Sequence, residues 1–167
     1  IDCGVPFKKL SSYLHKLNLV LLTHIHIDHF NKATIKKLAS ERPMLRFGCG
    51  EWLVPELIKC GVSKFNIDVY GFDENYKYGK FEIIALPLVH NVPNLGYKIH
   101  FADGSKMMYA TDTNNLNGIT AQDYDLYMVE SNYDDEEIQD RIAEKEERGE
   151  FVYEKKIKKN HLSREKC

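Results

Sequence analysis

Hydrophobic positions follow a helical period in the first part of the chain. Apolar side chains recur every three or four residues over Phe7–Leu17, Asn31–Glu41 and Glu51–Cys60, which predicts three helices. Asn31 can accept a hydrogen bond from the first turn of the second helix. Short, mainly apolar runs over Asn18–Leu22 and Met44–Gly48 predict short strands between these helices.

The pattern then changes to consecutive strands. Turn residues separate short apolar segments, and we expect strands over Phe65–Tyr70, Phe81–Leu88, Gly96–Phe101, Lys106–Tyr109 and Asp125–Glu130. A charged helix with a thin apolar stripe follows over Asp134–Arg148. This order of elements predicts a layered α/β protein with mixed sheets. No linker divides the 167 residues, so we expect one domain over 1–167, truncated at one or both termini because it opens on IDCG and stops at HLSREKC.

Composition narrows the class of protein. The net charge is −2, which excludes a bulk nucleic-acid binder of the histone kind but leaves room for a local basic patch. No apolar stretch is long enough to span a bilayer, and no signal peptide is visible. The four cysteines form no CxxC pair, so we expect reduced thiols in a cytoplasmic protein. The sequence leaves monomer and homodimer open.

The stretch THIHIDHF, residues 23–30, holds the densest group of ionisable side chains. It follows the apolar run LVLL, and side chains two apart in an extended segment point the same way, so His24 and His26 should share a face. If the next helix begins near residues 28–31, Asp28 and His29 lie in its first turn. Imidazole and carboxylate groups are ligands for Zn²⁺, Mn²⁺ or Fe²⁺. The spacing suits two adjacent metals, one held by His24 and His26 and the other by Asp28 and His29.

Three further donors lie at or beyond the ends of predicted elements. His90 follows the apolar strand FEIIALPLV, Asp112 follows MMYAT, and His161 stands in KKNHLS. A carboxylate at Asp112 can bridge two metals through its two oxygens. Each residue alone is also explained as an ordinary polar loop residue, and their shared place at element ends is what favours ligation.

This set of motifs resembles the metallo-β-lactamase-fold hydrolases, from Asp2 in IDCG to His161 in HLS. The resemblance implies a four-layer αββα sandwich with two mixed β-sheets. It also implies that His24, His26 and His90 hold one metal, that Asp28, His29 and His161 hold a second, and that Asp112 bridges. Asp2 matches an aspartate that supports the ligands from behind. Zn²⁺ is our first choice of metal, with Mn²⁺ or Fe²⁺ as alternatives.

Within that family the sequence looks most similar to the small YycJ-type branch, whose members are thought to be nucleases or phosphodiesterases. We therefore expect a hydroxide bridging two metals to attack a phosphodiester in single-stranded nucleic acid or a small nucleotide, with Asp28 orienting it as a catalytic residue. A thioester or lactone hydrolase similar to glyoxalase II is the alternative. A metal-binding interaction module without activity is a third hypothesis.

A run of lysines precedes His161. Lys155, Lys156, Lys158 and Lys159 suit either a surface that attracts phosphate groups or an ordinary solvated helix face, and the sequence does not decide between them.

Overall fold

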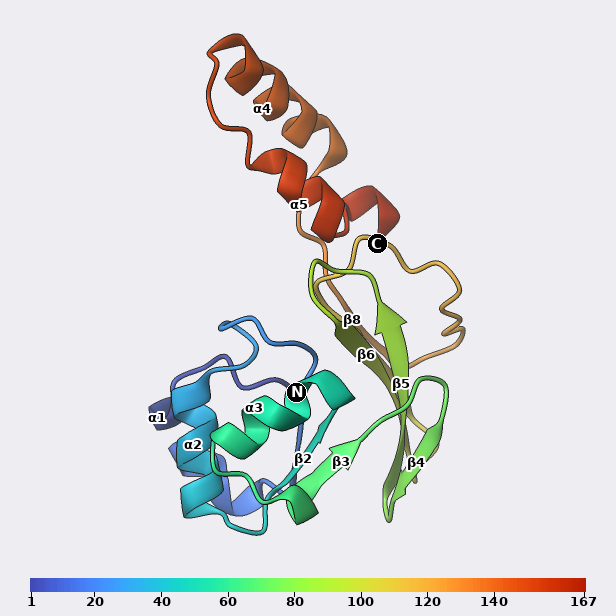
Figure 1. Cartoon of the computed structure of the whole chain (residues 1–167). Helices are drawn as coiled ribbons and strands as arrows, with labels where there is room; N and C mark the ends of the chain where they lie inside the picture. The colour runs from blue at the N-terminus through green and yellow to red at the C-terminus, as the bar shows by residue number, and fades with distance from the viewer. The chain divides into compact units, whose positions relative to one another are not determined.

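The computed structural model describes residues 1–167, which fold into two compact units, Ile1–Glu74 and Asn75–Cys167. The first unit holds a three-stranded sheet in the order β1-β2-β3, and every pairing in it is parallel. Its strands are β1 (Leu19–Leu21), β2 (Arg46–Cys49) and β3 (Ile67–Val69), and its α-helices are α1 (Phe7–Leu10), α2 (Lys32–Glu41) and α3 (Val54–Lys59). Figure 1 shows helices and strands alternating along the chain in this unit.

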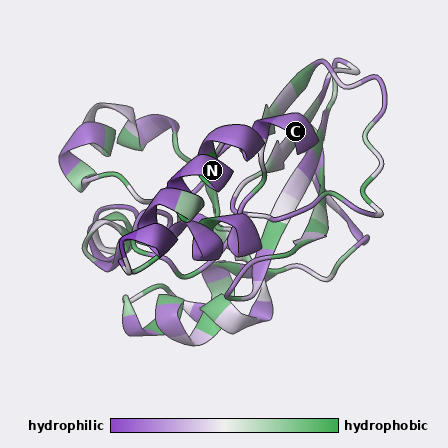
Figure 2. Cartoon of the chain, turned by 90° about the horizontal axis from the view of Figure 1, so that it is seen from above, coloured by the Kyte–Doolittle hydropathy of each residue, from purple (hydrophilic) through white to green (hydrophobic).

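Helix α2 has the signals that its sequence predicts. Asn31 adopts an extended conformation, and its side chain accepts a hydrogen bond from the backbone N–H of Thr34 at 3.1 Å. Ile35 and Leu38 are fully buried, whereas the lysines on the other face are exposed. Hydrophilic and hydrophobic residues alternate along the helical ribbons in Figure 2, as expected of amphipathic helices.

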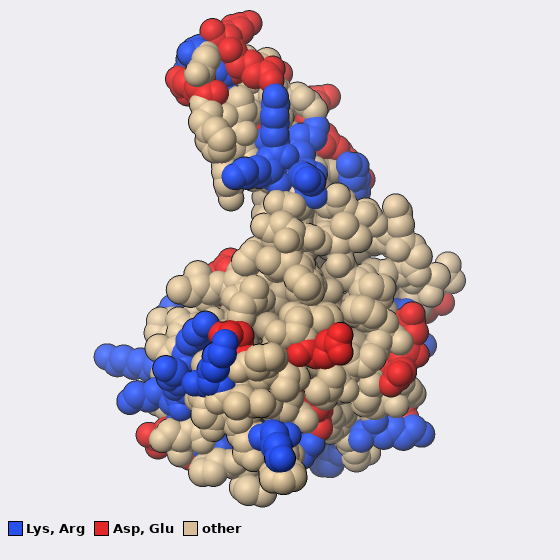
Figure 3. Space-filling model, in the orientation of Figure 1, with Lys and Arg blue, Asp and Glu red and all other residues tan.

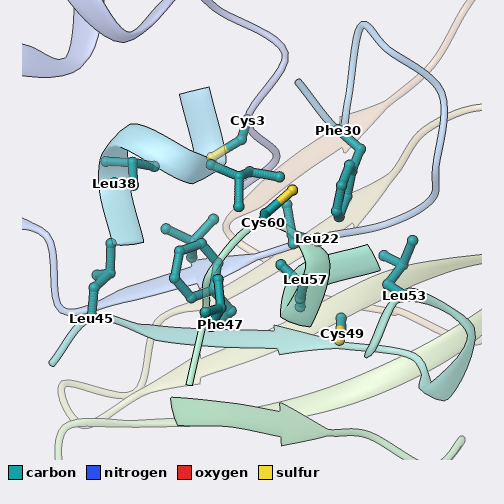
Figure 4. Close-up of a cluster of buried hydrophobic side chains, with 13 residues drawn as sticks. Cys3, Leu22, Phe30, Leu38, Leu45, Phe47, Cys49, Leu53, Leu57 and Cys60 are labelled. Atoms are coloured by element: carbon teal, nitrogen blue, oxygen red, sulfur yellow. The ribbon is translucent and has the colours of Figure 1, made fainter. Parts of the chain in front are cut away.

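Buried apolar side chains hold the first unit together. Figure 4 shows the cluster, in which Phe47 from β2 lies among residues contributed by both the helices and the strands. Leu22, Phe30, Phe47 and Leu57 are each at most 1% exposed. Burying an aromatic or branched side chain of this size contributes about 1.5–3 kcal/mol each. The stretch THIHIDHF is therefore anchored by Leu22 just before it and by its last residue, Phe30.

The second unit is built on a five-stranded sheet in the order β4-β5-β6-β7-β8. The pairings from β4 to β7 are antiparallel, and β8 pairs with β7 in parallel. The strands are β4 (Asn75–Tyr78), β5 (Phe81–Leu88), β6 (Asn94–Phe101), β7 (Lys106–Ala110) and β8 (Leu126–Val129). Because β5 and β6 pair along their full length, the hairpin between them holds the segment around His90 at one end of the sheet.

Two helices extend from this sheet as a hairpin, α4 (Asp135–Glu147) and α5 (Glu154–Asn160), drawn in orange and red in Figure 1. Asp134 caps α4 by accepting hydrogen bonds from the N–H groups of Glu136 and Glu137. The residues before and after the hairpin lie side by side, because Tyr133 and Ser163 form a parallel bridge at its base. No helix in the structure combines the length and the hydrophobicity needed to cross a membrane.

Most predicted elements are confirmed, and the differences have physical causes. The α/β class and the two sheets are as predicted, although the smaller sheet is purely parallel rather than mixed. The first helix is only α1 followed by a 3₁₀ helix over Ser11–Lys16. The sequence analysis missed β4 and α5, because NYKY is too short for its alternation to stand out and EKKIKKN has only one apolar residue.

Candidate metal centre

The end of β1 directs two histidines toward one point. His24 is fully buried, and its Nε2 lies 3.1 Å from Nδ1 of His26. Nδ1 of His24 lies 3.0 Å from Oγ1 of Thr23. Because that hydroxyl donates its proton to the Asp2 carboxylate, it accepts from His24, which leaves the Nε2 lone pair for a ligand. Two nitrogen ligands of a tetrahedral Zn²⁺ lie about 3.3 Å apart, since each bond is about 2.0–2.1 Å. The observed separation fits that requirement.

A buried carboxylate orients the third histidine. Oδ2 of Asp2 accepts a hydrogen bond from Nδ1 of His29 at 2.8 Å, and Oδ1 accepts from the backbone N–H of Thr23 at 2.9 Å. With Nδ1 protonated, His29 presents Nε2 as a ligand atom. Asp2 has a φ of 60°, a left-handed conformation that is uncommon outside glycine and is typical of functional positions.

Close packing of the two segments keeps this arrangement in place. The backbone N–H of Cys3 donates to the carbonyl of His29 at 2.8 Å. At Gly4 the approach is so close that a Cβ would lie 1.6 Å from the carbonyl oxygen of Asp28, so no larger residue fits without moving the backbone. Glycine at this position therefore lets the segment that carries Asp2 lie against the histidine turn.

The position of Asp28 differs from the prediction. Asp28 and His29 do not lie in the first turn of α2, which begins at Lys32; they lie in a separate turn, closed by hydrogen bonds from the N–H groups of His29 and Phe30 to the carbonyl of His26. The condition that the helix begins early enough to include Asp28 is not met, because the predicted Asn31 cap places the helix start at Lys32. The Asp28 side chain is 75% exposed, and its Oδ2 is 3.7 Å from Nε2 of His29.

The second unit brings the other three predicted ligands together. Oδ2 of Asp112 lies 3.7 Å from Nε2 of His90, and Oδ1 lies 3.8 Å from Nδ1 of His161. Each oxygen therefore faces a different imidazole. Asp112 has a φ of 51°, so it shares with Asp2 the strained left-handed backbone. Nδ1 of His90 donates to the carbonyl of Asn160 at 3.0 Å, which leaves its Nε2 toward Asp112.

Glu130 is a residue that the sequence analysis did not single out. Its Oε2 accepts a hydrogen bond from Nδ1 of His161 at 2.9 Å, and its Oε1 accepts from the backbone N–H of Thr113. One ligand atom each from Asp112, Glu130 and His161 lie within 4.8 Å of one another. Burial raises the pKa of Glu130 above its usual range, while the hydrogen bond from His161 opposes that shift. The signal was present in the sequence, since Glu130 directly follows a strand, as Asp112 nearly does.

In both clusters a carboxylate, a carbonyl or a hydroxyl holds one ring nitrogen of a ligand imidazole and leaves the other for a metal. Imidazole nitrogens and carboxylate oxygens are the donor set that first-row divalent metals accept, and hydrogen bonds behind the ligands fix their tautomers. The residues in both clusters therefore fit divalent metal ions.

The sequence pattern of the beta-lactamase superfamily domain matches residues 2–162, so the chain belongs to that family. No curated protein matches it. Among solved structures it is similar to the metallo-beta-lactamase fold protein YhfI from Bacillus subtilis, with 21% identity and a TM-score of 0.70 over 97% of this chain and 64% of that protein. The chain thus spans less than two thirds of the length of YhfI.

Two further solved structures have the same fold at lower identity. Human tRNase Z, short form, is 14% identical with a TM-score of 0.63, over 98% of this chain and 72% of that one. A metallo-beta-lactamase with a HARLDQ motif from Cronobacter sakazakii is 14% identical with a TM-score of 0.53, over 84% of this chain and 69% of that one. These comparisons confirm the predicted metallo-β-lactamase fold. They do not single out the YycJ-type branch, which stays a prediction.

Proposed function

We propose that this protein is a hydrolase dependent on two divalent metal ions, and that it cleaves a phosphodiester bond in single-stranded nucleic acid or a small nucleotide. The observation that carries the proposal is the pair of clusters, each with imidazoles whose free ring nitrogen is set by a hydrogen bond at the other nitrogen. Family membership and the likeness to tRNase Z, whose name describes a nuclease, support it.

The proposed ligand assignment is the one that the family resemblance implies, and in it each metal would take ligands from both clusters. We assign one metal to His24, His26 and His90 and the other to Asp28, His29 and His161, with Asp112 shared between them. Zn²⁺ suits this set best, and Mn²⁺ or Fe²⁺ would also accept it. When bound, two such ions lower the pKa of a water molecule and neutralise charge on a phosphate group. The proposal treats the two units as one catalytic domain of a cytoplasmic protein.

The protein's own groups prepare the site for that chemistry. Asp2 and Glu130 hold His29 and His161 with Nδ1 protonated, so that each ring keeps one orientation. Asp28 is exposed and stands beside His29, so its carboxylate can also accept a proton from an attacking water or orient it.

The test is hydrolysis by the metal-loaded protein. Loaded with Zn²⁺ or Mn²⁺, it should hydrolyse bis-p-nitrophenyl phosphate and a single-stranded oligonucleotide in preference to a thioester. Thioester turnover alone would favour the glyoxalase-like alternative, and bound metal without turnover of either substrate would favour a non-catalytic module.

A pair of variants tests the site itself. Asp28→Ala should lower kcat at least 100-fold while the circular dichroism spectrum is unchanged, since it removes a ligand and the exposed carboxylate. Asp103→Ala is the control, because Asp103 is an exposed loop carboxylate that contacts only Ser105. His161→Ala should reduce the bound metal from two ions per chain to one. Equal turnover for Asp28→Ala and the control would refute the assignment.

A further inference from the structure

Helix α5 is attached directly to the predicted metal ligands. His161 follows its last residue, and the carbonyl of Asn160 accepts the hydrogen bond from Nδ1 of His90 at 3.0 Å. The carbonyl of Lys159 accepts another from Nδ2 of Asn114, in the loop that follows Asp112, at 2.9 Å. The C-terminal end of α5 is therefore held beside this cluster, and whatever binds the helix lies next to the predicted site.

Ion pairs distinguish the lysines of this helix from one another. Lys155 pairs with Glu146 at 2.6 Å. Lys158 lines a hollow together with three carboxylates, those of Asp135, Glu136 and Asp140. Lys156 and Lys159 are exposed and have no carboxylate partner. In Figure 3 the basic side chains gather over α5, while acidic ones surround the outer end of the hairpin. Two of the four lysines are thus available to an anion.

Two exposed aromatic rings lie at the start of the helix that carries these lysines. Phe151 is 73% exposed and Tyr153 is 56% exposed. Nζ of Lys156 lies 5.6 Å from the centre of the Phe151 ring. Tyr153, Lys156 and Lys159 follow one another at intervals of three, so they lie along one side of the helix. We call Phe151, Tyr153, Lys156 and Lys159 the aromatic–basic face.

We propose that the aromatic–basic face binds single-stranded nucleic acid, with bases stacked on its rings and phosphates on its two lysines. The inference rests on the proposed function and names the substrate as a strand rather than a mononucleotide. Exposed rings suit unpaired bases, since bases within a duplex keep their faces stacked on one another. Helix α5 has seven residues and is about 10 Å long, which matches about three stacked nucleotides at 3.4 Å each. A strand cleaved at the metals therefore reaches Phe151 within a few nucleotides.

The experiment measures binding rather than turnover. A fluorescein-labelled, single-stranded oligonucleotide of twelve residues is titrated with the whole chain in EDTA, and fluorescence anisotropy gives Kd at several salt concentrations. The test variant is Lys156→Ala/Lys159→Ala. The control is Lys155→Ala/Lys158→Ala, which removes the same charge from the same helix but takes lysines that already face carboxylates.

The inference predicts different results for the two variants. Lys156→Ala/Lys159→Ala should weaken binding at least 10-fold and reduce the slope of log K against log salt by about 1.4, since each single-strand phosphate contact contributes about 0.7. Phe151→Ala/Tyr153→Ala should weaken binding at least 5-fold without changing that slope, because stacking involves no counterion release. The control should bind as the wild type does.

Three results would overturn it: equal weakening in both lysine variants, tighter binding of a matched duplex than of the single strand, or no binding by the wild type. The proposed function fails separately, through absent turnover of bis-p-nitrophenyl phosphate by the metal-loaded wild type. If the protein binds the single strand but does not hydrolyse bis-p-nitrophenyl phosphate, the proposed function is wrong and the binding role of the aromatic–basic face is still supported.

Discussion

Replacing Asp2 by Asn changes one atom in the support of the first cluster. Oδ1 of Asp2 accepts from the backbone N–H of Thr23, and Oδ2 accepts from Nδ1 of His29. An asparagine that keeps its oxygen on Thr23 turns its amide NH₂ toward His29. Since that NH₂ group only donates, His29 has to accept at Nδ1 and carry its proton on Nε2, the atom that we assign to a metal. The substitution therefore selects the wrong tautomer without changing the size of the side chain.

Two magnitudes follow from the geometry. The Asp2 side chain is 8% exposed and that of His29 13%, so water replaces little of the lost interaction. Losing a support of this kind typically lowers metal affinity about 10- to 100-fold, which is about 1.4–2.7 kcal/mol. The metal-free protein should also lose about 1–1.5 kcal/mol of unfolding free energy, because a hydrogen bond to a carboxylate is replaced by one between neutral groups.

Competition with a chromophoric chelator measures the affinity for each metal, and urea unfolding in EDTA measures the free energy. The matched control is Asp103→Asn, with the same charge change at an exposed loop carboxylate. We expect weaker binding of the metal assigned to His29 and unchanged behaviour in the control. If Asp2→Asn binds both metals as tightly as the wild type, the tautomer argument is wrong.

Three further predictions concern other parts of the molecule. Phe47→Ala should lower the free energy of unfolding by about 3–5 kcal/mol, because the ring is fully buried, and a loss below about 1 kcal/mol in urea unfolding would contradict this packing. A thiol reagent should label Cys167 rapidly in the native protein and the other three cysteines only after unfolding, because those three are buried. Burial also raises the pKa of Cys3 and of Cys49 to about 12, which leaves little thiolate to react. Glu56→Gln should be less stable than the wild type at pH 7, with the difference vanishing as the pH falls from 4.5 toward 2, because hydrogen bonds from two lysines lower the pKa of Glu56 to about 2. A difference independent of pH in urea unfolding would rule out that cause.

The parts of the fold that could be predicted are those with a local signal. The Asn31 cap and the apolar spacing behind it define α2, and the apolar run over Phe81–Leu88 matches β5 residue for residue. Helix α5 carries one apolar side chain, Ile157, and is stabilised by contacts with α4 and by the ion pair between Lys145 and Glu154. Such contacts join one helix to the next, so no apolar period within α5 itself reports them.

The candidate site shows the same division. The chemistry of the histidines and of Asp112 is visible in the residue types and their place after strands. Which nitrogen each imidazole presents is decided by partners such as Thr23 and the carbonyl of Asn160, and backbone carbonyls carry no sequence signal. Glu130 also follows a strand, but its role depends on a hydrogen bond to His161, 31 positions away, which its residue type and position alone do not report.

The bridge between Tyr133 and Ser163 has a consequence for the order in which the protein assembles. His24, His26 and His29 are neighbours in the chain and come together once β1 and its turn form. His161 comes beside His90 only after the α4–α5 hairpin has formed and brought the chain back to the sheet. Closing a longer loop costs more chain entropy. We expect the cluster around Asp112 to form late in folding, and a nascent chain to bind metal fully only after His161 has been made.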